Sequence, residues 1–146
     1  MALTDTDYVI LNTEITTDPE SLGYAGKTDP EVADLLNTIG LVAPAEKVDV
    51  GVLNGQELSM AVEITEYVAL NAASRDGWNT ILSAGDGQVD VDDQRVVDQI
   101  AAIWGAGTTT RANLLALKTR PCSRAETLFG RGVSIHHLDV AQARVI

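Results

Sequence analysis

Two stretches of this 146-residue sequence hold residue types that could bind phosphate or a metal ion. Residues 105–111 (GAGTTTR) are rich in glycine and hydroxyl groups, but they lack the lysine of GxxxxGK[ST] and the third glycine of GxGxxG. Residues 86–93 (DGQVDVDD) are dense in acids. However, an EF-hand loop counted from Asp86 would have Val91 in place of its glycine and Val97 in place of its glutamate. Both stretches are therefore interpreted as turns and helix caps.

The remaining reactive residue types also lack a catalytic pattern. His136 and His137 are adjacent, so they point in different directions, and neither an HExxH motif nor a cysteine pair accompanies them. Cys122 is the single cysteine, which fits synthesis in a reducing cytoplasm, and there is no GxSxG element. The sequence therefore predicts a non-enzymatic protein with no metal ligand and no cofactor.

The charged residues are unevenly distributed along the chain. Ten Lys and Arg face 21 Asp and Glu, a net charge of −11. Residues 1–100 hold four of the cations and 19 of the acids, whereas residues 101–146 hold six cations and two acids. An acidic body with a basic C-terminal part could stack head-to-tail on copies of itself, or both could simply be solvated surfaces. An acidic body of this size disfavours direct binding of nucleic acid.

Arginine is the side chain best suited to paired hydrogen bonds with a carboxylate. The hypothesised interface residues, acting as charge anchors toward an acidic neighbour, are Arg111, Arg120, Arg124 and Arg131.

The elements that must position these residues are mostly helical. Apolar residues recur at helical spacing behind strong cap signals, among them Thr28 with Glu31, and Ser123 with Glu126. Helices are expected near residues 5–17, 29–39, 55–62, 64–72, 75–83, 93–104, 109–118, 124–129 and 137–144. In the sixth of these, Trp104 lies on the apolar stripe and is predicted to be a core residue.

The prediction is an all-α fold: residues 1–146 form a single helical domain, a bundle of several short helices with long loops. Alternating residues allow one small two-stranded β ribbon, with residues 48–53 paired to residues 88–91. Acids stand where a signal peptide would have a basic flank, and no apolar run could span a bilayer, so no membrane association is expected.

Both ends of the chain resemble a known group of proteins. The N-terminal part carries LNTEITTDP (11–19), Gly23-Tyr24 and VADLLN (32–37). The C-terminal part carries IWGAGTTTRANL (103–114), LKTRP (117–121), SRAE (123–126) and LFGRGV (128–133). These segments, about half of the chain, resemble a group of small virion-morphogenesis proteins that tailed bacteriophages and prophages encode. The middle, residues 41–91, shares only the general character of the group.

The resemblance implies a structural protein of a tailed-phage virion, made in the bacterial cytoplasm, with no catalytic residues. The expected role is a head–tail connector or adaptor in the neck, forming a homo-oligomeric ring and contacting the portal, tail or capsid. The alternatives are a capsid cement or decoration protein and a tail-assembly factor. From a different class, a small nucleic-acid-binding regulator would use the same arginines on phosphate.

Overall fold

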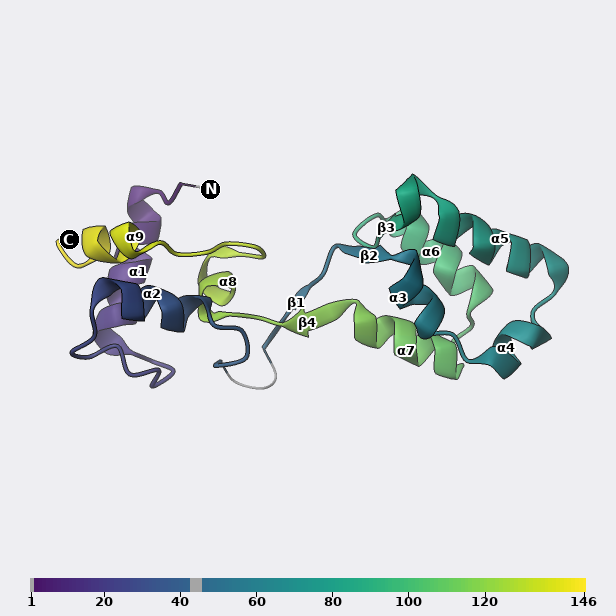
Figure 1. Cartoon of the computed structure of the whole chain (residues 1–146), viewed down its shortest axis with the longest axis horizontal. Helices are drawn as coiled ribbons and strands as arrows, with labels where there is room; N and C mark the ends of the chain where they lie inside the picture. Colours follow the sequence, from purple (N-terminus) through teal and green to yellow (C-terminus); the bar gives the residue numbers. More distant parts are fainter. Residues whose placement is uncertain (1, 43–45) are drawn as a thin grey trace. The chain divides into compact units, whose positions relative to one another are not determined.

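A computed structural model describes residues 2–42 and 46–146. The secondary structure is mostly helical with a few three-residue strands, which confirms the predicted all-α class (Figure 1). The chain divides into two compact units. Unit 1 comprises Met1–Val48 with Pro121–Ile146, and unit 2 comprises Asp49–Arg120. The sequence predicts one domain over residues 1–146, and among the described residues each unit has its own set of packed apolar side chains.

The described residues of unit 1 form four helices from the two ends of the chain: α1 (Asp5–Thr17), α2 (Asp29–Asn37), α8 (Arg124–Phe129) and α9 (His137–Ala143). Helix α9 packs against both α1 and α2, and α8 packs against α2. The buried apolar residues of this unit include Leu11, Tyr24, Val32, Leu36, Ala125, Ile135 and Val140. Because residues far apart in the sequence share this core, the N- and C-terminal segments must fold together.

The helices of unit 1 begin where the sequence predicts. Thr28 and Glu31 form the expected capping box at the start of α2, and Ser123 and Glu126 form another at the start of α8. His136 is the N-cap of α9, where its Nδ1 accepts the Leu138 amide at 3.4 Å, and both His136 and His137 are exposed.

Unit 2 contains the five helices α3 (Gly55–Met60), α4 (Ile64–Ala69), α5 (Ala72–Ser83), α6 (Gln94–Ile103) and α7 (Thr109–Leu117), with one 3-10 turn (Gly85–Gly87). Strand β2 (Val52–Asn54) pairs antiparallel with β3 (Gln88–Asp90), with Leu53 opposite Val89. The predicted β ribbon is therefore confirmed, with its first strand at residues 52–54, whereas Lys47–Asp49 form a strand of a different pair. Trp78 and Trp104 lie in the core of this unit, with ring centroids 5.4 Å apart at 86°, as expected for Trp104.

The expected helix start near residue 75, which would make Ser74 the N-cap, is wrong, because α5 begins at Ala72. Asn71 is the N-cap of α5, and its Oδ1 accepts the Ser74 amide at 2.8 Å. The preceding helix ends at Ala69 because Leu70 takes an extended conformation. Asn is as good an N-cap as Ser, so local propensity did not separate the two candidates.

Strands β1 (Lys47–Asp49) and β4 (Thr119–Pro121) pair with each other. The boundary between the units falls within each of these strands, between residues 48 and 49 in β1 and between residues 120 and 121 in β4.

A tight backbone contact in unit 2 predicts a stability difference between two glycines. A Cβ at Gly55 would lie 2.8 Å from the Leu82 carbonyl oxygen, whereas a Cβ at Gly77 would lie 3.6 Å from the Ile103 Cδ1 atom. We expect Gly55→Ala to lower the free energy of unfolding by about 1–3 kcal/mol through overpacking. Gly77→Ala, in the interior of α5, should be neutral or stabilising by about 0.5–1 kcal/mol. Urea denaturation of both variants measures the difference; equal effects would contradict the contact.

Candidate protein-binding site

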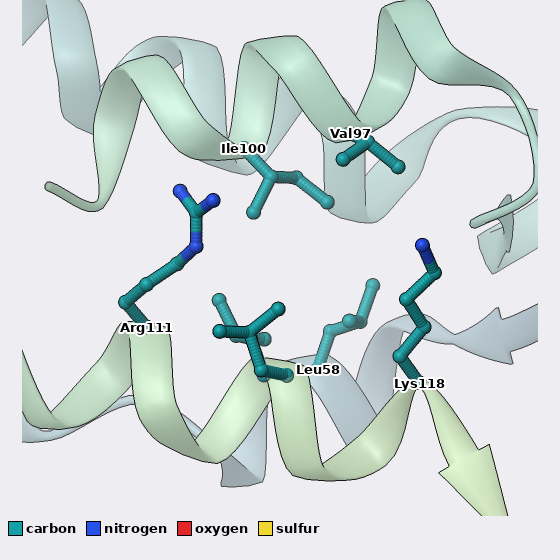
Figure 2. A pocket seen from close by; sticks show the side chains of 7 residues that line it. Leu58, Val97, Ile100, Arg111 and Lys118 are labelled. Carbon is teal, nitrogen blue, oxygen red and sulfur yellow. The ribbon is translucent and has the colours of Figure 1, made fainter. Parts of the chain in front are cut away.

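The surface of unit 2 has a small apolar groove between α6 and α7. Val97 and Ile100 of α6 lie on one side of it and Leu114 and Leu115 of α7 on the other, with Leu58 of α3 beneath. Figure 2 shows Arg111 and Lys118 extending from α7 at the two ends of this groove. We call these seven lining residues the α6–α7 groove.

Helical spacing explains why cations and leucines share this face. Residues 111, 114, 115 and 118 stand at i, i+3, i+4 and i+7, so all four project from one side of α7. Ile100 and Leu114 are buried in the core of the unit, whereas Leu115 is 55% exposed. The floor of the groove is therefore fixed by the core, and its rim is open to a partner.

The Arg111 side chain is held in place by the end of α6. Its Nη1 donates to the Trp104 carbonyl oxygen at 3.1 Å, an acceptor that the helix itself leaves free. Among residues 2–42 and 46–146, no carboxylate forms an ion pair with Arg111 or Lys118. Both cations can therefore receive a carboxylate from another molecule.

The start of α7, and with it the position of Arg111, depends on Glu66 of α4. One Glu66 carboxylate oxygen accepts the Thr109 amide and the other accepts the Thr110 amide, each at 2.7 Å. The buried Thr110 hydroxyl accepts the Glu63 amide at 2.9 Å. A carboxylate at these amide groups also has the favourable sign for the helix dipole.

These contacts make the stability of unit 2 depend on pH. Hydrogen bonding from the Thr110 side chain, and then from the Thr110 and Thr109 amides, lowers the pKa of Glu66 in the folded state. A depressed folded-state pKa gives stability that is present above the unfolded pKa, about 4.3, and is lost as the pH falls. We expect Glu66→Gln to be less stable than wild type at pH 7 and to lose less stability on acidification.

Thermal unfolding of wild type and variant between pH 7 and pH 3 measures this effect. The matched control is Asp76→Asn, which changes an exposed α5 carboxylate that makes no hydrogen bond within the described chain. If both variants follow the same pH profile, Glu66 does not act through the start of α7.

The groove suits a protein side chain better than a metabolite. Its volume is about 50 Å³. Sites for small molecules typically enclose roughly 300–1,000 Å³. Its chemistry is an apolar surface edged by two positive charges. A partner segment with one or two apolar side chains and nearby carboxylates would match it.

The four hypothesised arginines are divided between the two units. Arg111 and Arg120 belong to unit 2, and Arg124 and Arg131 belong to unit 1. Arg120 lies half-buried on β4, and Arg131 is exposed after α8. Sequence reasoning missed Lys118 as a member of the groove; the i, i+7 spacing from Arg111 is the signal that could have identified it.

Arg124 is not a surface anchor, because it is buried inside unit 1. It is 8% exposed, and its Nε and Nη2 atoms donate to the two carboxylate oxygens of Glu14, both at 2.9 Å. Glu20 adds a second acid at 3.5 Å, and the Tyr24 hydroxyl donates to Glu14 Oε1 at 3.1 Å. Burial, together with the Glu14 charge, raises the pKa of Tyr24. This cluster joins α1 to α8 and stabilises the fold.

The charge of the two units also differs from the sequence expectation. Unit 1 holds five cations and eleven acids, and unit 2 holds five cations and ten acids, giving net charges of −6 and −5. The basic C-terminal part is not a separate body, because residues 121–146 fold with the acidic residues 1–48. Head-to-tail attraction between an acidic and a basic end therefore loses its structural basis, and the groove becomes the more specific interaction surface.

Residues 2–42 and 46–146 contain neither a metal-binding cluster nor a membrane-spanning helix. No group of three or more His, Cys, Asp or Glu side chains in that part of the chain could hold a metal ion. None of its helices has the length and apolar composition that a bilayer crossing requires. Comparisons with protein-family models, curated proteins and solved structures gave no match to this chain.

Proposed function

We propose that this chain is a structural component of a tailed-phage virion, a head–tail connector or adaptor that assembles as a ring between portal and tail. The observation that carries the proposal is the α6–α7 groove, an exposed apolar site edged by Arg111 and Lys118 that fits part of another protein. A structural role of this kind needs binding surfaces and gives the chain no catalytic step. The resemblance of both chain ends to phage morphogenesis proteins supports the virion context.

The groove supports contact with an acidic protein more than contact with nucleic acid. Two leucines separate its cations on one helix face, so its centre is apolar. Nucleic-acid sites depend on rows of cations that neutralise successive phosphates. The chain itself carries a net charge of −11, so further copies of it are suitable acidic partners.

The location of the protein in purified phage particles tests the proposal. Immunogold labelling and electron microscopy with an antibody against this chain should mark a single vertex of each particle. Label over the whole shell would identify a cement or decoration protein instead. Particles without label would indicate a tail-assembly factor, or a regulator if the purified protein binds DNA with a steep salt dependence.

A groove variant links the location to the site. Leu115→Glu places a charge on the exposed rim without touching the buried floor. We expect this variant to be folded but missing from particles in a complementation experiment, and the particles to lack attached tails. Leu138→Glu, at a comparably exposed leucine of α9 in unit 1, is the control and should be incorporated. Incorporation of both variants would remove the groove from the proposal.

A further inference from the structure

Unit 2 exposes a second apolar surface besides the groove. Met60 at the end of α3 is 79% exposed, and Ile64 and Val68 of α4 are 66% and 64% exposed. Ile64 and Val68 are one helical turn apart, so they project from the same face of α4. We call Met60, Ile64 and Val68 the α3–α4 ridge. Exposed apolar side chains that share one helix face, as Ile64 and Val68 do, are a feature of interaction sites.

The ridge lies in a purely acidic part of the chain. Residues 49–74 contain four acids and no lysine or arginine. Two of the acids, Glu57 and Glu63, flank Met60 closely in sequence. The Oε2 atom of each accepts backbone amides at a helix start. The segment that carries the ridge therefore holds both apolar side chains and carboxylates, the composition that matches the groove between Arg111 and Lys118.

The ridge and the groove are distinct surfaces of the same unit. No residue of the ridge lines the groove, whose sides come from α6 and α7. Hydrogen bonds from the Thr109 and Thr110 amides to Glu66 fix α4 against the start of α7, so the two surfaces are held in a set relation to each other. A contact between two different patches of one protein is heterologous, and such contacts repeat into rings or filaments.

We infer that the α3–α4 ridge of one copy docks into the α6–α7 groove of the next copy. Apolar ridge side chains contact Leu115 and Val97 at the rim, and carboxylates of the acidic segment pair with Arg111 and Lys118. The inference rests on the proposed ring-forming role and specifies the two surfaces that join the copies.

Sedimentation of the purified full chain tests the inference. Wild type should self-associate with increasing protein concentration, and association should weaken at high salt because the rim charges are screened. Ile64→Glu on the ridge and Leu115→Glu on the groove should each raise the apparent dissociation constant about tenfold or more. Leu138→Glu should leave it unchanged, and circular dichroism should show all three variants folded.

Mixing the two defective variants gives the decisive readout. Each retains one intact surface, so the mixture should form a heterodimer and nothing larger, with the Ile64→Glu groove occupied by the Leu115→Glu ridge. A mixture that remains monomeric would overturn the inference, and so would wild type that stays monomeric up to millimolar concentration. Equal loss in Leu138→Glu would also overturn it.

These results separate the inference from the proposed function. A protein that labels one vertex of the particle but never joins its own copies keeps the connector role and loses the ridge-to-groove contact. If the two variants form a heterodimer but the protein is absent from particles, the ridge-to-groove contact stands and the connector role is contradicted.

Discussion

Replacing Arg124 by methionine should destabilise unit 1 severely, by about 3–5 kcal/mol, because the substitution leaves a buried carboxylate without its cation. Glu14 is 3% exposed, and after the loss of Arg124 the Tyr24 hydroxyl is the one group among the described residues that would still donate to its carboxylate. The measurement is urea denaturation, with hydrogen exchange to locate the loss. Amide protection should fall mainly in residues 2–42 and 121–146.

Arg144→Met is the matched control, because it makes the same substitution in an ion pair at the surface. Arg144 pairs with Asp29, and both side chains are about one-third exposed. Solvent screening limits such a pair to about 0–1 kcal/mol. If Arg124→Met costs no more than Arg144→Met, the buried pair does not hold α1 to α8.

A double variant separates the charge effect from loss of packing. Glu14→Met combined with Arg124→Met removes both charges, and apolar side chains of similar length fill the space. Replacing a whole buried pair in this way is often neutral, so the double variant should recover much of the stability that Arg124→Met loses. A double variant as unstable as the single one would show that packing dominates at this site.

The burial of Arg124 also decides how assembly can be tested. Charge reversal at Arg124 would place two carboxylates together inside unit 1, so a loss of assembly would report unfolding. Lys118→Glu reverses a charge at the end of the groove without placing like charges together in the core, since Lys118 makes no ion pair within the described chain. It is therefore the better charge variant for the contact between copies.

Local sequence signals predicted the helices well because they act within a few residues. The capping boxes at Thr28 and Ser123 each join side chains three residues apart, and Thr108 caps α7 as expected. The β2–β3 ribbon could also be predicted from the sequence, because its strands have alternating residues and turn glycines lie beside them.

The division into two units could not be predicted in the same way. It depends on contacts between the ends of the chain, such as the Asn12 side-chain amide donating to the Ala143 carbonyl at 2.8 Å. The role of Arg124 depends likewise on Glu14, 110 residues away. Charge totals along the sequence carry no information about such pairings, so a basic segment looked like a free surface.

The groove was only partly predictable. The i, i+3, i+4, i+7 spacing on α7 places Arg111, Leu114, Leu115 and Lys118 on one face. However, the sequence does not say whether such a face is buried or open. That depends on how α7 packs into the core of unit 2, where Leu114 is buried and Leu115 is left exposed.

Replacing Trp104 by alanine should be the most damaging single change in unit 2, costing about 3–5 kcal/mol of unfolding free energy. Trp104 is 1% exposed and contacts Trp78 edge-to-face, so the truncation opens a cavity and removes an aromatic pair. Its indole Nε1 has no hydrogen-bond partner among the described residues, so little polar contact is lost with it. Trp104→Phe, which keeps an aromatic ring and removes that buried donor, should cost clearly less.

Hydrogen exchange and sedimentation together show what this destabilisation does to the binding surface. The Trp104 backbone carbonyl holds Arg111 at the end of the groove, and α6 supplies one of the groove's two sides. Trp104→Ala should therefore lose amide protection chiefly within residues 49–120 and lose self-association in parallel. Leu115→Glu should lose self-association but keep the amide protection of the wild type. If Trp104→Ala unfolds this unit and copies still associate through it, the groove is not the surface that joins them.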